Sequence, residues 1–248
     1  MPENLSMERI LKAISKRRWW LAQWFVRGLS SEYHAYSDLF HPFFAPRAGW
    51  GSGLGPAVFT LYGLARTLRP ETIVEIGSAR GKSTCALALA CRQNGCGKIY
   101  AIDPHTTNLW SEGESGENTD VFLRRRLRTY RLTSYCEIIK ASSAEASKTW
   151  SRKIDLLFID GDHTYEGVKL DFDLFAPWCS EQALILFHDT MWDYLKADPS
   201  RRSDQGVPRF LDELRQRNYH SVNLWAPPGL ALLSPRPGGF RYLESNQA

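Results

Sequence analysis

Two short runs in the second half of the chain combine acidic residues with histidine. IDGDHTY contains Asp160, Asp162 and His163, and FHDT contains His188 and Asp189. Each run follows an apolar stretch typical of a buried strand, and in doubly wound sheets ligands bind at the carboxyl ends of the strands. Carboxylate oxygens suit Mg²⁺ or Ca²⁺, and a nearby imidazole also admits Mn²⁺. We therefore predict that Asp160 and Asp189 hold a divalent cation.

Two of these side chains also have a purely structural interpretation. Asp162 can cap the helix that follows it. His188 can be a core histidine whose hydrogen bonds are satisfied by its neighbours. The residues alone leave both alternatives open.

A glycine turn, VEIGSARGKST, follows another apolar run. Gly77 allows a tight turn and Gly81 a close approach of the backbone, and the next helix offers free N–H groups to a ligand. The turn is one residue too short for the phosphate loop GxxxxGK[ST], because Ile76 stands where that loop needs its first glycine. It also departs from the dinucleotide motif GxGxxG, because Ala79 takes the place of the second glycine.

The pattern that remains is E-x-G-x-x-x-G, formed by Glu75, Gly77 and Gly81. The next apolar run ends in IYAIDPH, which places Asp103 about half a Rossmann unit downstream. A carboxylate there can accept hydrogen bonds from both ribose hydroxyls of a cofactor. For Asp103 alone an ordinary strand-ending turn is the alternative, but the glycine turn favours the cofactor.

Strand and helix patterns alternate along most of the chain, which predicts a doubly wound, Rossmann-like α/β fold. We expect a seven-stranded sheet that is mostly parallel and ends in an antiparallel C-terminal hairpin. The expected strands are 72–76, 98–102, 136–139, 154–159, 183–187 and two within 219–234. The expected helices are 57–68, 82–91, about 118–130, near 144–150, near 165–175 and 207–217.

The composition is that of a globular protein, with 43% hydrophobic and 23% charged residues among 248. The net charge of +4 is too small to indicate nucleic-acid binding. Five cysteines with no CxxC pair favour reduced thiols over disulfides or a zinc site, and hence a cytoplasmic protein. We find no signal peptide or membrane-spanning run, and we expect a homo-oligomer.

Residues 1–56 form a predicted N-terminal extension, made of a helix at 7–29 and a Gly/Pro-rich loop. The helix carries Trp19, Trp20 and Trp24 beside a basic run. We expect it to pack against protein, either the same chain or a second subunit. Binding to a membrane surface is the less favoured alternative.

The E-x-G-x-x-x-G turn resembles motif I of class I S-adenosylmethionine-dependent methyltransferases. IDGDHTYEGVKLDFDLFAP, FHDT and GVPRFLDEL are further similar to a family of metal-assisted small-molecule O-methyltransferases. That family is distantly similar to catechol O-methyltransferase and includes sugar and antibiotic tailoring enzymes, some labelled cephalosporin hydroxylase. The similarity covers about residues 71–214, and the first 50 residues resemble nothing known to us.

The resemblance implies a role for each matching residue. The methionine end of S-adenosylmethionine would be contacted by Glu75, Gly77, Ser78, Gly81 and Ser83. The ribose would be bound by Asp103, and the adenine would lie against Ser142, Ser143 and Ala144. Asp160, His188 and Asp189 would hold the cation, which would be Mg²⁺, or else Mn²⁺ or Ca²⁺. His188 stands where many family members have Asp or Glu. His163 stands where members carry Lys or His, which implies a general base. An imidazole with an ordinary pKa near 6.5 suits that role.

We therefore expect residues 57–248 to form a methyltransferase domain that acts on a hydroxyl group of a small molecule, such as a sugar or natural product. Two alternatives remain. One is a metal-independent methyltransferase of the same fold, and the other is a regulatory protein that keeps the cofactor fold without catalysis. Catalysis requires Asp160, His163 and Asp189 to converge.

Overall fold

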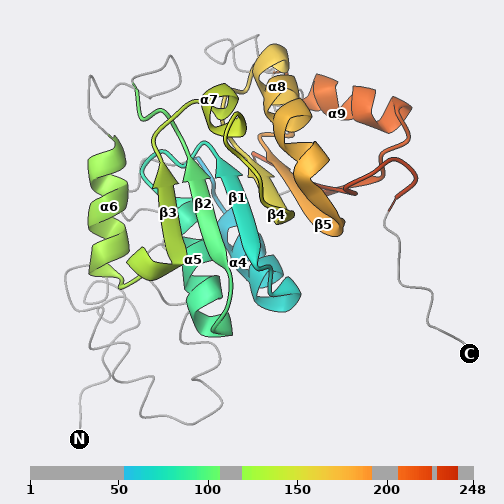
Figure 1. Cartoon of the computed structure of the whole chain (residues 1–248). Coiled ribbons are helices and arrows are strands. Elements are labelled where there is room, and N and C mark those ends of the chain that lie inside the picture. Colours follow the sequence, from blue (N-terminus) through green and yellow to red (C-terminus); the bar gives the residue numbers. More distant parts are fainter. Residues whose placement is uncertain (1–52, 107–118, 192–205, 225–227, 240–248) are drawn as a thin grey trace, which may run out of the picture. The chain divides into compact units, whose positions relative to one another are not determined.

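The computed structural model describes residues 53–106, 119–191, 206–224 and 228–239 (Figure 1). Nearly all of the predicted extension, residues 1–56, lies outside the described residues, so the Trp-rich helix and its partner stay predictions. Among the described residues, no helix combines the length and apolar character needed to cross a membrane.

A seven-stranded sheet with the order β3-β2-β1-β4-β5-β7-β6 forms the centre of the described structure (Figure 1). Neighbouring strands from β3 to β5 are parallel, and β7 is antiparallel to both β5 and β6. The strands are β1 Thr72–Ile76, β2 Lys98–Ile102, β3 Cys136–Ile139, β4 Ile154–Ile159, β5 Cys179–His188, β6 Ser221–Leu224 and β7 Leu230–Leu233. This confirms the predicted fold class.

Six α-helices are described, and they are α4 Ala57–Leu68, α5 Lys82–Asn94, α6 Thr119–Thr129, α7 Ser143–Ser147, α8 Tyr165–Phe175 and α9 Val207–Gln216. Side chains of α7, α8 and α9 share one core cluster with alternate residues of the central strands, such as Val74 and Ile76 of β1. Ile73, which precedes Val74 and faces the opposite side of the sheet, is also fully buried. Both faces of the central strands are therefore covered, which explains their unbroken apolar runs.

The register of the sheet brings the predicted functional segments to one edge. Ile76, the last residue of β1, lies opposite Ile102 on β2 and Ile159 on β4. Ile159 in turn lies opposite Phe187 near the end of β5. The segments that follow these strands therefore start at the same level, and they carry the glycine turn, Asp103 and the two acidic runs.

Two details differ from the sequence-based expectation. β5 begins at Cys179 rather than Ala183, and its register with β4 shifts between Ile154 and Leu156. The short helix α7 ends at Ser147, not near Trp150. The expected antiparallel hairpin does lie at the edge of the sheet, with β6 outermost and β7 between β6 and β5. All five cysteines are free, as expected.

Candidate active site

The glycine turn has a backbone that only glycine accommodates without strain. Gly77 has φ +89°, and a Cβ atom on it would lie 2.0 Å from the carbonyl oxygen of Asp160. Gly81 has φ +84° and precedes α5, and its N–H donates to the Ser78 carbonyl at 2.7 Å. Ala79 between them also has a positive φ of 41°. The turn is thus tightly folded against the loop after β4, with α5 starting directly behind it.

Glu75, on β1 two residues before Gly77, is fully buried. Burial raises the pKa of its carboxyl group to about 8, although the hydroxyl groups of Ser83 and Thr84 lower it. Its Oε1 atom and the hydroxyl of the buried Ser78 have no hydrogen-bond partner among the described residues. Unpartnered buried polar atoms are rare in proteins. Together they suit the polar methionine end of a cofactor.

Asp103 ties the end of β2 to the glycine turn. Its two carboxylate oxygens accept the backbone N–H groups of Ala79 at 2.7 Å and of His105 at 2.6 Å. Each oxygen keeps a further lone pair, because a carboxylate offers about four acceptor sites. The carboxylate is therefore held in place with acceptor sites to spare, and its role in binding the ribose stays a prediction.

The segment predicted to lie near the adenine, Ser142 to Ala144, forms the start of α7. Ser142 is the N-cap of this helix, and its hydroxyl accepts the backbone N–H of Glu145 at 3.2 Å. Glu145 accepts the backbone N–H of Ser142 at 3.0 Å, which completes a capping box. The Ser142 side chain is thus engaged in the helix, and contact with a base is left to Ser143, Ala144 and the backbone.

The structure brings Asp160, His163 and Asp189 together at the ends of β4 and β5. One ligand atom from each lies within 4.8 Å of the other two, a spacing that could accommodate a metal ion. His163 Nε2 is 3.0 Å from Asp189 Oδ2 and 3.4 Å from Asp160 Oδ1. His188 Nδ1 contacts the same two carboxylates, at 2.9 Å from Asp160 Oδ1 and 3.3 Å from Asp189 Oδ2.

The electrostatics of this cluster are those of two carboxylates sharing two imidazoles. Burial would raise the pKa of Asp160, but His188 and His163 hold it at about 2. Burial would lower the pKa of His188, but Asp160 and Asp189 raise it to about 10. The pKa of His163 is likewise raised by Asp160 and Asp189 against the effect of burial. The imidazoles thus act as counter-charges to the carboxylates.

The donor set fits a divalent cation. The two carboxylates offer oxygen ligands that suit Mg²⁺ or Ca²⁺, and the imidazole nitrogen beside them also admits Mn²⁺ or another transition ion. Sequence analysis assigned His188 to the ligands and His163 to proton transfer. The three-residue group contains His163 instead, while His188 is only 3% exposed and pairs with both acids. The core-histidine alternative for His188 therefore has structural support.

Asp162 lies close to this cluster but takes part in local structure. Its Oδ1 accepts the backbone N–H of Thr164 at 3.0 Å, and Thr164 is the N-cap of α8. The structural alternative for Asp162 thus holds in a modified form, because it fixes the turn before the helix rather than capping the helix itself.

Two further buried residues lie near the site: His105, over which His163 was preferred as general base, and Asp171, which sequence reasoning missed. His105 has a positive φ of 51°, and its Nδ1 lies 2.8 Å from the hydroxyl of Thr119. Asp171 lies on the buried face of α8. For Asp171 a signal was available, because helical spacing places it between Val168 and Phe175 on an apolar face, where a carboxyl group is unexpected.

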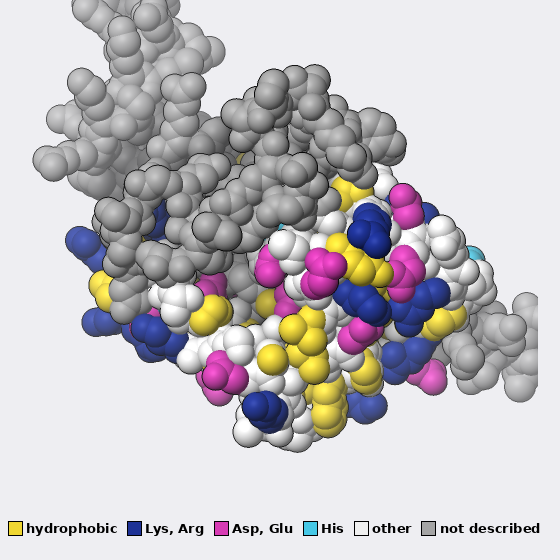
Figure 2. Space-filling model, turned by 90° about the horizontal axis from the view of Figure 1, so that it is seen from above, with side chains coloured by type: hydrophobic (Ala, Val, Ile, Leu, Met, Phe, Trp, Pro, Cys, Tyr) yellow, Lys and Arg dark blue, Asp and Glu magenta, His cyan; other side chains and the backbone are white. Residues whose placement is uncertain are grey.

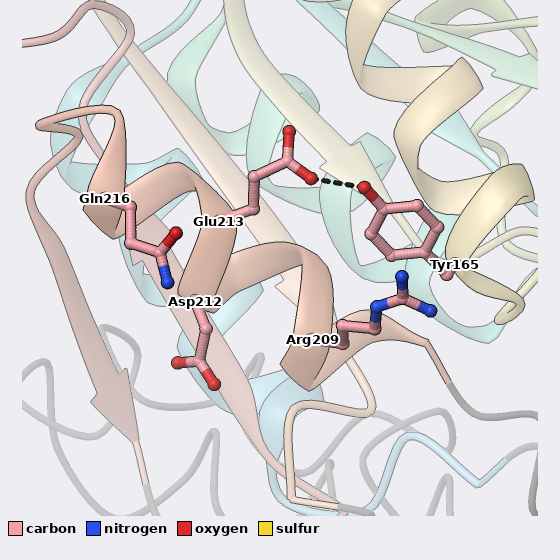
Figure 3. Close-up of a pocket in the computed structure, with 5 residues that line it drawn as sticks. All are labelled: Tyr165, Arg209, Asp212, Glu213 and Gln216. Carbon is pink, nitrogen blue, oxygen red and sulfur yellow. Dashed lines mark hydrogen bonds between the residues drawn. The ribbon is translucent and has the colours of Figure 1, made fainter.

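A polar hollow of about 360 Å³ lies between α8 and α9 (Figure 3). Its lining residues are Tyr165, Arg209, Asp212, Glu213 and Gln216. The Tyr165 hydroxyl donates to Glu213, and the Arg209 guanidinium lies 4.1 Å from the centre of the Tyr165 ring. Seen from above, acidic and basic side chains lie side by side on the described surface on the right of Figure 2. Asp212 pairs with Arg215, Glu213 pairs with Arg217, and Arg209 lies over the Tyr165 ring, so the hollow by itself does not indicate a ligand.

A family model and a curated relative each match part of this chain. Residues 74–190 match the family model described as a methyltransferase domain. A curated relative, an uncharacterized protein of Sinorhizobium fredii, is 28% identical over 151 residues. The alignment covers 60% of this chain but only 16% of that protein. The chain thus spans about a sixth of the length of that relative.

Solved O-methyltransferase structures share the fold at low sequence identity. A putative caffeoyl-CoA O-methyltransferase from Staphylococcus aureus has a TM-score of 0.60 and 20% identity, over 87% of this chain and 97% of that chain. The S-adenosylmethionine complex of TomG, an O-methyltransferase of tomaymycin synthesis from Streptomyces achromogenes, has a TM-score of 0.57 and 18% identity, over 88% and 97%. Residues 74–190 thus match a methyltransferase domain, and the chain shares the fold of these solved O-methyltransferases.

Proposed function

We propose that the chain is a divalent-metal-assisted O-methyltransferase that acts on a hydroxyl group of a small molecule, with a sugar or natural product as the acceptor class. The observation that carries the proposal is the convergence of Asp160, His163 and Asp189 within 4.8 Å. This cluster adjoins the glycine turn, because the Asp160 carbonyl occupies the space that a Gly77 side chain would need.

In the proposed reaction the acceptor oxygen attacks the methyl carbon of the sulfonium, the carbon–sulfur bond breaks, and S-adenosylhomocysteine leaves as a neutral sulfide. The protein contributes mainly position and electrostatics, since such a displacement needs no covalent intermediate. The glycine turn and Asp103 would orient the cofactor. Asp160 and Asp189 would hold a cation, which when bound lowers the pKa of the acceptor hydroxyl. In the cation-free protein burial lowers the pKa of His163, but the two carboxylates raise it above its ordinary value. A bound cation would offset the charge of these carboxylates, so that His163 could then receive the hydroxyl proton.

The cofactor half of the proposal is tested by calorimetry with S-adenosylhomocysteine. We expect micromolar binding, while ATP and NAD bind no better than a nonspecific nucleotide. Asp103→Ala should weaken binding by about 1–3 kcal/mol, the usual loss for hydrogen bonds to a charged group. Tight binding of ATP or NAD, or unchanged affinity in the Asp103 variant, would contradict this assignment.

The chemical half is tested by incubation with methyl-labelled cofactor and a panel of hydroxylated acceptors, with and without a chelator. Label transfer that stops in chelator supports the proposal. Transfer that continues identifies the metal-independent alternative of the same fold. Cofactor binding with no transfer to any acceptor class, in the presence of Mg²⁺ or Mn²⁺, favours the non-catalytic alternative.

A further inference from the structure

Asp171 is a buried carboxyl group that the proposed reaction does not use. It belongs to the buried face of α8, together with Val168, Phe172 and Phe175, and is only 4% exposed. Burial raises the pKa of its carboxyl group to about 6. A carboxyl group on an apolar face lowers stability unless its hydrogen bonds are made. Its contacts therefore need an explanation.

Two loops of the candidate site meet at this carboxyl group. Burial raises the pKa of Asp171 and the Ser143 side chain, at the start of α7, lowers it, so Ser143 lies beside this carboxyl group. Gly161, in the loop after β4, lies against it from another side, since a Cβ atom on Gly161 would come within 3.0 Å of Asp171 Oδ2. Asp171 thus touches the predicted adenine segment and the acid-bearing loop at once.

The contact continues from Gly161 to the glycine turn. A Cβ atom on Gly77 would lie 2.7 Å from the Gly161 Cα and 2.0 Å from the Asp160 carbonyl oxygen. The Asp160 N–H also donates to the carbonyl oxygen of Ile76 at 2.8 Å. Gly77 is therefore packed directly against Gly161, and Gly161 directly against Asp171, with no room for an additional side-chain atom at either contact.

We propose that Asp171 is a positioning residue for the cofactor, which fixes the glycine turn at the methionine end relative to the Ser142–Ala144 segment at the adenine end. It acts through Gly161 on one side and Ser143 on the other, without touching the cofactor itself. The inference rests on the proposed cofactor site, because only a ligand that spans both segments is sensitive to their relative position.

The test compares Asp171→Asn with the wild-type chain. Asn has nearly the same volume but loses the charge and one acceptor oxygen. The matched control is Asp173→Asn, because Asp173 lies two residues further along α8 with its side chain 46% exposed, paired with Lys169 at 2.9 Å. The probes are S-adenosylhomocysteine, which spans both segments, measured by calorimetry, and adenosine, which reaches one, measured by ligand-detected NMR.

We expect Asp171→Asn to weaken S-adenosylhomocysteine binding about tenfold and adenosine binding less than twofold, and Asp173→Asn to change neither. General destabilisation would weaken both probes alike, and that result would overturn the inference. So would affinity for S-adenosylhomocysteine within twofold of wild type. Ser143→Ala, which removes only the hydroxyl donor, should show the same selective loss and serves if the Asp171 variant does not fold.

A double variant measures whether the two residues act together. If Asp171 works partly through Ser143, Asp171→Asn with Ser143→Ala should bind S-adenosylhomocysteine no more weakly than the worse single variant. Losses that multiply would contradict a shared path. If the wild-type chain does not bind S-adenosylhomocysteine at all, the proposed cofactor site itself fails, and this outcome is distinct from wild-type binding that the Asp171 variant retains.

Discussion

His163 and Asp189 face each other across the ends of two neighbouring strands, with His163 Nε2 3.0 Å from Asp189 Oδ2. β4 and β5 are parallel and in register at Ile159 and Phe187, so the residues just beyond both strands meet. The same imidazole nitrogen is 3.4 Å from Asp160 Oδ1. An acceptor hydroxyl held between Asp160 and Asp189 would therefore lie within reach of His163.

The first prediction concerns His163→Ala. We expect turnover at saturating metal to fall by about 10²–10⁴, the usual contribution of a positioned general base. Affinity for S-adenosylhomocysteine should change little, because none of the predicted cofactor contacts involves this imidazole. The matched control is His220→Ala, which removes an exposed histidine beyond α9. More than about a third of wild-type turnover in the His163 variant would exclude the imidazole from proton transfer.

The second prediction concerns removal of divalent cations. Dialysis against a chelator should abolish methyl transfer and leave S-adenosylhomocysteine binding largely intact, because the carboxylates serve the acceptor side of the site. Added Mg²⁺ or Mn²⁺ should restore transfer in the wild-type chain but not in Asp189→Asn. Metal content is checked by mass spectrometry. Full turnover in excess chelator with metal near zero would show that the acids have a structural role.

Local patterns were sufficient to predict most of the elements. β1 to β4 and α8 have the predicted bounds, because each is a continuous apolar run or a clear helical stripe between turn residues. The start of β5 was missed because Ser180, Glu181 and Gln182 are polar, and their place in the strand depends on pairing across the sheet. The position of β7 between β5 and β6 could not be predicted, because the local sequence pattern does not indicate which strands are neighbours in the sheet.

The same division holds for the candidate site. Types and spacing indicated Gly77, Asp103, Asp160 and Asp189, since strand ends and glycine turns are visible in the sequence. The contact of both His163 and His188 with the same two carboxylates was not visible, because it depends on which way the fold turns each imidazole. Asp171 was missed because its partners, Ser143 and Gly161, come from two other segments of the chain.

The third prediction compares Gly77→Ala with Gly81→Ala. Both glycines have a positive φ, which costs about 1–3 kcal/mol for other residues. A Cβ atom at Gly81 would meet the Leu123 side chain at 2.3 Å, and a side chain can rotate away. At Gly77 it would meet the Asp160 backbone at 2.0 Å, which moves only with the whole loop. Gly77→Ala should therefore lose more unfolding free energy and more S-adenosylhomocysteine affinity. Unfolding free energy is measured by urea unfolding and affinity by calorimetry. Equal losses in the two variants, or larger losses in Gly81→Ala, would contradict the importance of the backbone contact at Gly77.

The fourth prediction concerns the protonation of Glu75. Its pKa of about 8 in the cofactor-free protein lies above the ordinary value of 4.5. The contribution of protonated Glu75 to the free energy of unfolding is therefore fully present below pH 4.5 and is lost as the pH rises to about 8. Wild-type stability should fall relative to Glu75→Gln across this window, as measured by urea unfolding at successive pH values. A constant difference between the two proteins would show that Glu75 is already ionised in the folded chain.

The same shift predicts that cofactor binding releases a proton. At pH 7 a carboxyl group with a pKa of about 8 is mostly protonated. If the cofactor ammonium group lies beside Glu75, binding lowers this pKa and most of one proton passes to the buffer. The calorimetric enthalpy of S-adenosylhomocysteine binding should then differ between phosphate and Tris at pH 7, by nearly the difference in their ionisation enthalpies. Glu75→Gln should abolish the difference, and raising the pH above 9 should remove it from the wild-type chain because the group is then already ionised. Equal wild-type enthalpies in both buffers at pH 7 would place the ammonium group away from Glu75 and assign the buried carboxyl group to the support of Thr84 and the glycine turn alone.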